Sequence, residues 1–242
     1  MKQIKFSICT ASLFMLMSCV DLNLNPLSEG SSENWYSSQA EIEMSLNDFY
    51  RTDFFPIDDM KWGDDVTARN ETSAVNNGTL TSEDGTIAKR WENYYKGIAR
   101  ALRIINNMDR ARAMGVSEKD IAQYEGEAYF YLGYAYGMLA FHWGDAILDK
   151  VGMGLDEAYT ASRSPKADVL AYSYECLDKA AERLPNSYPG IQRATKGAAY
   201  AFKARIAIYN EDYAAAATAA KNCMDLNVYK LHSNYQDLFT AS

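Results

Sequence analysis

Hydrophobic residues recur at intervals of three and four along most of the chain, which is the spacing of one face of an α-helix. The clearest pattern predicts a helix over residues 87–112, ended by Gly115. Its apolar positions are Trp91, Tyr95, Ile98, Leu102 and Ile105. A shorter pattern predicts a helix over residues 39–51. Its apolar positions are Ile42, Leu46, Phe49 and Tyr50.

A third helix is predicted over residues 117–142, where Ser117 stands at the N-cap and an acid, Asp120, follows at the fourth position. Its apolar face consists of Ile121, Tyr124, Ala128, Leu132, Ala135 and Leu139. Gly126, Gly133 and Gly137 would weaken this helix in isolation. We therefore expect them to let neighbouring helices approach closely.

Pro165 is placed to open a further helix that reaches residue 184 and ends before Pro185. Thr195 is placed to cap the next helix, residues 196–209, which a very short turn separates from the last, residues 212–226. Such a turn forces antiparallel packing, and small residues opposite aromatic ones resemble a tetratricopeptide unit. The predicted facing positions are Ala201, Ala204, Ile208 and Tyr209 against Tyr213, Ala216, Ala217 and Ala220. With no sustained strand pattern, the predicted fold is an all-α, tetratricopeptide-like helical repeat bundle.

One segment breaks this regularity. Residues 53–86 show no helical period and are rich in Asp, Asn, Thr, Ser and Gly. Loops of this length inside a compact domain are usually functional or disordered. This one places Trp62 among acidic and amide side chains.

The N-terminus has the features of an export signal. Lys2 and Lys5 precede an apolar stretch that is shorter than the roughly 20 residues needed to cross a bilayer. It ends in Leu16-Met17-Ser18-Cys19, which resembles a bacterial lipobox, so residues 1–18 are predicted to be a lipoprotein signal peptide. Cys19 would then carry the acyl chains that anchor the protein to a membrane.

The rest of the chain divides into a polar tether, residues 19–34, and a helical domain, residues 35–242. The chain has 24 Lys and Arg against 32 Asp and Glu, and this net charge of −8 argues against nucleic acid as a partner. Cys176 and Cys223 both fall on predicted helices, where cysteine behaves as a small hydrophobe. A disulfide between them stays possible in an exported protein.

Taken in order, these features resemble the RagB/SusD family of outer-membrane lipoproteins of Bacteroidetes. The matching residues are Cys19, Leu46, Tyr50, Asp64, Asp65, Trp91, Tyr94, Tyr95, Ile98, Trp143, Gly144, Asp145, Arg163, Ser164, Pro165, Ala180, Leu184, Pro185, Thr195, Lys196, Gly197, Ala198, Ala199, Ala204, Arg205, Tyr209, Tyr229, Leu231, Tyr235, Leu238 and Phe239. The chain departs from the family pattern at Ile147, where proline is usual, and at Cys176, where aspartate is usual. Family members continue into a C-terminal half, so the chain is expected to be the N-terminal half.

The resemblance implies binding and uptake without catalysis or a cofactor. Family members face the cell exterior, bind glycans or other nutrients, and deliver them to a SusC-like TonB-dependent transporter. The alternative is a tetratricopeptide-type scaffold lipoprotein that mediates protein–protein interactions in the cell envelope. A pure scaffold has no need of a tryptophan among acids and amides in a long loop, so that loop distinguishes the two hypotheses.

The ligand-binding candidates lie in this loop, because a flat aromatic face with planar polar groups beside it suits a sugar. They are Trp62, Asp64, Asp65, Arg69 and Asn70. Clustered acids also suit Ca²⁺, but those of this loop lack EF-hand spacing, and no metal site is predicted. Those acids are Asp58, Asp59, Asp64 and Asp65. A glycosidase pair drawn from them is the weakest reading, because the separation of two carboxyl groups cannot be read from sequence.

Other conspicuous residues are expected to have structural roles. Trp91, Tyr94 and Tyr95 lie on a predicted helix and are expected to be core. Asp145 is expected to hold a turn, and His142 to be a helix C-terminal cap and not a ligand-binding residue. The run Asn76-Asn77-Gly78 reads as a tight turn.

Overall fold

The computed structural model describes residues 35–56 and 74–239, and those from Tyr36 onward belong to one compact unit. The helices are α2 (Gln39–Asn47), α3 (Gly85–Asn106), α4 (Met108–Ala113), α5 (Glu118–Trp143), α6 (Leu155–Thr160), α7 (Lys166–Arg183), α8 (Lys196–Tyr209) and α9 (Tyr213–Asp225). Two 3₁₀ helices, η2 (Asp48–Tyr50) and η4 (Tyr235–Phe239), complete the described elements. The described residues contain no β-strand, only an isolated bridge between Ala146 and Ser164. The prediction of an all-α fold is confirmed.

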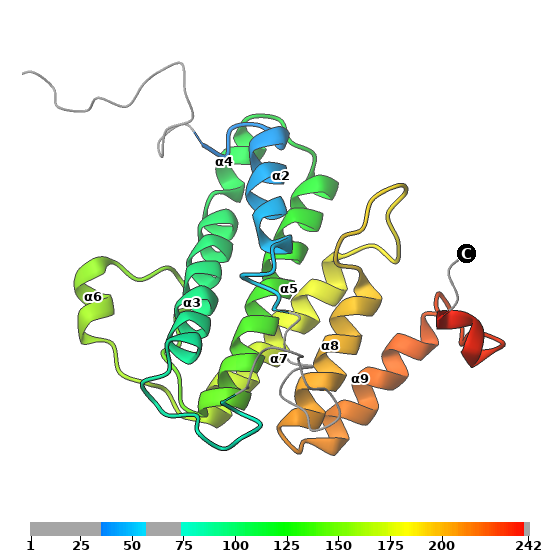
Figure 1. Ribbon diagram of the computed structural model, residues 1–242. Helices are drawn as coiled ribbons and strands as arrows, with labels where there is room; N and C mark the ends of the chain where they lie inside the picture. The colour runs from blue at the N-terminus through cyan, green and yellow to red at the C-terminus, as the bar shows by residue number, and fades with distance from the viewer. Residues whose placement is uncertain (1–34, 57–73, 240–242) are drawn as a thin grey trace, which may run out of the picture. The chain divides into compact units, whose positions relative to one another are not determined.

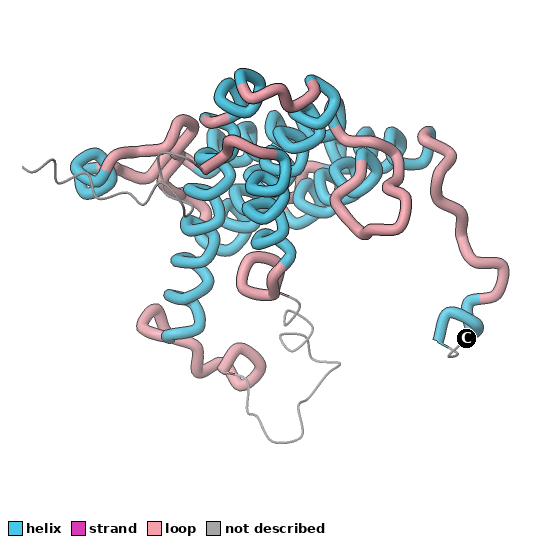
Figure 2. The backbone as a smooth tube through the Cα atoms, turned by 90° about the horizontal axis from the view of Figure 1, so that it is seen from above, coloured by secondary structure: helices cyan, strands magenta, loops and turns pink. Residues whose placement is uncertain are grey.

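Helix α5 is the centre of the bundle and contacts α2, α3, α4, α7 and α8 (Figure 1). Helices α3 and α7 run antiparallel to it, and α8 and α9 extend the layer on the α7 side (Figures 1 and 2). All six predicted apolar positions of this helix are buried. The predicted N-cap is also confirmed, because Ser117 Oγ accepts the Asp120 N–H at 3.2 Å.

The three glycines of α5 lie where its neighbours approach most closely. A Cβ atom at Gly133 would lie 2.5 Å from Leu177 Cγ of α7, and one at Gly137 would lie 2.5 Å from Ile206 of α8. At Gly126 it would lie 3.0 Å from the Leu184 side chain. Real Cβ atoms essentially never lie at 2.5 Å and rarely at 3.0 Å, and a close-packed interior leaves little room for the neighbours to move away. The predicted close approach is confirmed.

Helix boundaries follow the predicted caps with two differences. Pro165 and Thr195 precede α7 and α8, and Thr195 Oγ1 accepts the Ala198 N–H at 3.2 Å. The predicted helix 87–112 is instead two helices, because the chain leaves helical geometry at Asn107. The predicted helix 39–51 likewise changes to a 3₁₀ turn at Asp48.

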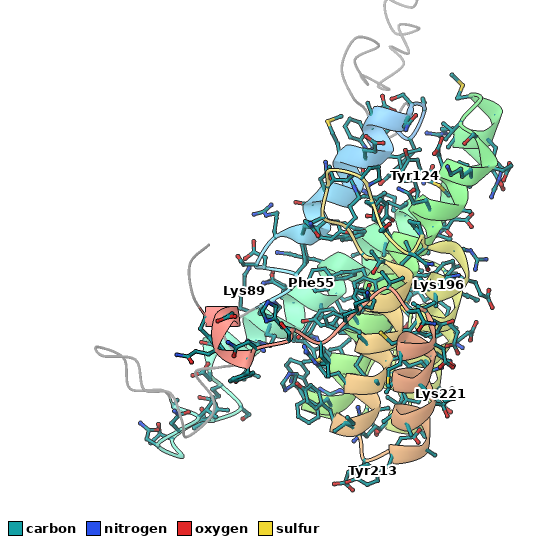
Figure 3. The ribbon with its side chains drawn as sticks, turned by 90° about the vertical axis from the view of Figure 1, so that its right-hand side faces the viewer. Phe55, Lys89, Tyr124, Lys196, Tyr213 and Lys221 are labelled. Carbon is teal, nitrogen blue, oxygen red and sulfur yellow. The ribbon has the colours of Figure 1, made fainter. Side chains whose placement is uncertain are left out.

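The predicted pairing of α8 with α9 is only partly right. Ala204 and Ala216 are buried, but all six of the other predicted facing positions are exposed. Those exposed are Ala201, Ile208, Tyr209, Tyr213, Ala217 and Ala220. The reason is that α8 also packs on α5, which turns Ile206 and Ala207 inward; Tyr213 points away from the helices at the α8–α9 turn (Figure 3).

The segment after α9 returns to the start of α8. The Tyr229 hydroxyl lies 2.9 Å from Thr195 Oγ1, and its ring would lie 2.2 Å from a Cβ atom at Gly197. Any residue other than glycine at this position would displace the ring. Cys223 lies nearby, with Sγ 3.5 Å from the Gly197 carbonyl oxygen. Cys223 and the buried Cys176 are both free thiols in this structure.

Candidate functional site

The predicted ligand-binding residues lie in the segment 57–73, outside the described residues. They are Trp62, Asp64, Asp65, Arg69 and Asn70. Asp58 and Asp59 fall in the same segment, and the predicted lipid attachment residue, Cys19, also lies outside the described part of the chain. Their roles therefore stay predictions. The structure shows how the bundle holds the two ends of the segment.

The first end is held by two consecutive phenylalanines. Phe54 is buried edge-on against Tyr131, with ring centroids 5.9 Å apart, and the Arg100 guanidinium lies over its ring. The Phe55 ring lies 4.6 Å from that of Tyr134 and 5.4 Å from that of Tyr131 (labelled in Figure 3). The chain therefore leaves the bundle from an aromatic surface of α5, because rings in such edge and tilted pairs attract one another.

The second end is held by a turn and a helix cap. The predicted turn at Asn76-Asn77-Gly78 is confirmed, because Gly78 has a φ of +70° and its N–H donates to the Val75 carbonyl at 3.3 Å. Asn77 Oδ1 accepts the Thr79 N–H at 3.1 Å. Asp84 then caps α3 by accepting the Thr86 N–H at 2.8 Å. The residues that follow the segment therefore form a self-contained turn, and helical structure resumes at the Asp84 cap of α3.

An aromatic cluster lies on the first turns of α3, close after this second end. Trp91 packs edge-on against Trp143 of α5, with ring centroids 5.3 Å apart, and the Arg163 guanidinium lies 5.0 Å from its ring centroid. Tyr95 donates to the Ile147 carbonyl at 2.9 Å, and burial raises the pKa of Tyr95 to about 12, so it stays a neutral donor. Tyr94 is buried as predicted, but Trp91 and Tyr95 are only half-buried.

Asp145 and His142 lie where expected, at the end of α5. Asp145 Oδ1 accepts the Lys166 N–H at 2.8 Å and so joins the end of α5 to the start of α7. His142 occupies the last turn of α5. No group of His, Cys, Asp and Glu that could hold a metal ion occurs within residues 35–56 and 74–239. In those same ranges, no helix is long and apolar enough to cross a bilayer.

A buried ion pair, which the sequence reasoning missed, closes another part of the bundle. Arg193 Nη1 donates to Glu127 Oε2 at 2.8 Å, and the two side chains are only 10% and 1% exposed. The Tyr50 hydroxyl donates to the same carboxylate oxygen at 2.8 Å and accepts the Ala194 N–H at 2.9 Å. Burial raises the pKa of Glu127, and the positive charge of Arg193 opposes that rise. The available signal was Glu127 itself, the last acid of the predicted helix before a long apolar run.

A shallow hollow of about 300 Å³ lies between α7, α8 and α9. Its polar lining includes Tyr174, Lys203 and Asp212, and alanines of α9 form its floor. Lys203 is already paired with Asp178, at 2.6 and 2.7 Å from the two carboxylate oxygens. The hollow therefore offers no unpaired cation to a ligand.

Comparison with known proteins identifies the family. A SusD-like family model, described as starch-binding and associating with the outer membrane, matches residues 30–208. Two curated relatives come from Formosa agariphila: SusD-like protein P38 is 26% identical over 243 residues, and SusD-like protein P2 is 23% identical over 253 residues. The matches cover 94% and 95% of this chain but only 47% and 48% of the relatives. The chain therefore spans about half the length of these relatives.

Solved structures show the same fold. A SusD-like carbohydrate-binding protein from Bacteroides fragilis superposes with a TM-score of 0.72 at 23% identity, over 85% of this chain and 44% of that one. A second structure, described as determined with xylogluco-oligosaccharide, gives a TM-score of 0.65 at 18% identity, over 82% of this chain and 43% of that one. At these identities the likeness concerns the fold. With the family model matching most of its length, the chain belongs to the SusD-like family.

Proposed function

We propose that this chain is the helical part of an outer-membrane lipoprotein that binds a glycan and passes it to a SusC-like TonB-dependent transporter. The family match over residues 30–208 carries this proposal, because that family is described as starch-binding and associating with the outer membrane. A relative of the same fold was determined with xylogluco-oligosaccharide. Binding requires no nucleophile, and we propose no catalytic step.

The segment 57–73 is the proposed place of glycan contact. Its neighbours support this choice, because Phe54 and Phe55 place the residues just before it against aromatic rings of α5. Trp62 would supply the flat face for a sugar ring; Asp64, Asp65, Arg69 and Asn70 would bond its hydroxyls.

Affinity electrophoresis of the mature chain, with Cys19→Ser, through gels containing starch, xyloglucan or other polysaccharides tests the proposal. We expect retardation by at least one glycan and its loss in Trp62→Ala. The matched control is Tyr213→Ala, which removes an exposed aromatic side chain far from this segment in sequence. If Trp62→Ala is retarded as strongly as wild type, the site lies elsewhere. If no glycan retards the chain in a gel that retards a SusD-like relative, glycan binding is contradicted.

Anchoring and partnership have separate tests. We expect palmitate labelling of the full chain in its native host, and its loss in Cys19→Ser. We also expect a TonB-dependent transporter to co-purify with the chain from detergent-solubilised outer membranes. Absence of the transporter, together with other envelope proteins in its place, would favour the scaffold alternative.

A further inference from the structure

The connection between α5 and α7, residues 144–165, makes a long excursion that carries the short helix α6. Figures 1 and 2 both show α6 set apart from the other helices, on the opposite side of the bundle from α9. No side chain of α6 is buried. The excursion therefore adds almost nothing to the core, and another reason for its shape is needed.

The first part of the excursion, residues 149–153, is fixed by hydrogen bonds to side chains of α3 and α5 and to the Asp149 carboxylate. The Tyr136 hydroxyl, on α5, donates to the Asp149 carbonyl at 2.7 Å and accepts the Asp149 N–H at 2.9 Å. The Asp149 carboxylate accepts the N–H groups of the next turn, from Val151, Gly152 and Met153, at 2.7 to 3.0 Å. The side chain of Asn106, at the end of α3, donates to the Val151 carbonyl at 2.7 Å.

The returning part is held as well. Ala146 and Ser164 exchange two backbone hydrogen bonds, at 2.8 and 3.2 Å, which close the excursion at its base. Asp145 accepts the N–H of Lys166 just beyond. Both ends are therefore fixed on the bundle, and the position of α6 between them is specified by the sequence.

The fixed excursion presents apolar side chains to solvent. Val151, Leu155 and Tyr159 are 69%, 73% and 82% exposed. Leu155 and Tyr159 are four residues apart on one helix, so their side chains share a face. Single exposed hydrophobics are ordinary, but an apolar patch on a raised element marks a contact surface.

The charge around this patch is negative. Helix α6 carries Asp156 and Glu157 in its first turn and no basic residue. The cations at the two ends of the excursion are directed at aromatic rings: Lys150 lies 4.8 Å from the Tyr172 ring centroid and Arg163 lies over Trp91. A complementary surface would be apolar at its centre and basic at its rim.

We propose that Leu155 and Tyr159, here called the α6 knob, insert into an apolar pocket bordered by lysine or arginine side chains on another protein. The recognition mode is that of a helix face entering a groove. The partner makes its contacts to α6. This inference is independent of the proposed glycan binding.

The first test is photocrosslinking in intact cells that make the full lipoprotein. The crosslinker p-benzoylphenylalanine replaces Tyr159, and the control replaces Tyr213, which is similarly exposed on α9. We expect an adduct from position 159 with a different protein, on a peptide that mass spectrometry shows to be apolar and flanked by Lys or Arg. A lipid adduct, a second copy of this chain, an acidic peptide or no adduct overturns the proposal.

The second test measures affinity for the protein captured in this way. Leu155→Asp should weaken binding roughly tenfold or more, as expected for a buried anchor. Asp156→Lys with Glu157→Lys should slow association and reduce its salt dependence. The control Tyr213→Asp should bind as wild type. Unchanged affinity of Leu155→Asp, with a normal circular dichroism spectrum, overturns the proposal; retardation of the same variant by glycan is expected to be unchanged.

Discussion

Two connections in this bundle are fixed in opposite ways. The connection between α7 and α8, residues 184–195, contains Arg193, whose charge is buried against Glu127. The connection between α5 and α7 is fixed by hydrogen bonds around Asp149 and presents apolar side chains outward. One therefore buries what is normally exposed, and the other exposes what is normally buried.

The difference suggests that the first connection stabilises the fold and that the second binds another protein. A buried charge is tolerated only when it is paired, so removing either Arg193 or Glu127 alone should destabilise the bundle. Exposed apolar side chains contribute little to the folded state, since unfolding scarcely changes their hydration. The first connection should respond strongly to substitution in stability measurements, and the second should respond mainly in binding.

The largest effect is expected from Arg193→Ala. Removing the cation leaves the Glu127 carboxylate buried without its partner, which should lower the free energy of unfolding by about 3–5 kcal/mol. Urea unfolding followed by circular dichroism measures the change. The control is Arg163→Ala, which removes a cation from the other connection and should cost only about 0.5–1 kcal/mol. An equal loss of unfolding free energy in the two variants would contradict the proposed difference between the two connections.

The deficit of Arg193→Ala should depend on pH. Burial already raises the pKa of Glu127, and loss of the Arg193 charge should raise it further. For an acid with a raised folded-state pKa, the stabilisation is complete below its unfolded pKa and is lost as pH rises through the folded pKa. The deficit relative to wild type should therefore shrink as pH falls from 7 toward 5. A deficit that is constant over this range would mean that Glu127 does not titrate there.

A moderate effect is expected at the base of the excursion. Tyr136→Phe removes the hydroxyl that pairs with both backbone groups of Asp149, and leaving such groups unpaired should cost about 1–3 kcal/mol. Thermal and urea unfolding measure the loss. The control is Tyr200→Phe, at a half-buried position on α8, and it should change the free energy of unfolding less. A neutral Tyr136→Phe would show that the excursion is fixed by its other contacts.

The smallest effect is expected from the α6 knob itself. The double variant Leu155→Ser, Tyr159→Ser should change the free energy of unfolding by less than about 0.5 kcal/mol, because both side chains are exposed. The same urea titration measures it. A loss above about 1 kcal/mol would mean that α6 supports the fold. The connection between α5 and α7 would then contribute to stability as well, and the contrast between the two connections would be wrong.

Much of the helical architecture could be predicted from local patterns. Helix starts could be predicted from the N-cap residues Ser117 and Thr195 and from the proline before α7. The close approach of neighbouring helices could be predicted from the glycines of α5. The face of α8 could not be predicted in the same way, because α5 and α9 compete for it. The choice depends on Ile206 meeting Gly137, a contact between residues far apart in the chain.

The functional surfaces were harder to predict. Trp62 and its polar neighbours were found from composition and family resemblance, and they stay predictions because they lie outside the described residues. The Arg193–Glu127 pair joins residues 66 positions apart, and no periodic pattern encodes that distance. Helix α6 is too short for its period to stand out, so its apolar face became apparent only from its exposure.

The ring of Tyr229 over Gly197 has a consequence for how the end of this helical region should be handled. The Tyr229 side chain, four residues beyond the end of α9, covers the first turn of α8 and reaches the hydroxyl that caps it. A protease cut just after Asp225 would therefore loosen a helix that begins about thirty residues earlier in the chain. Fragments and fusions of this region should keep residue 229, even though it lies beyond the last long helix.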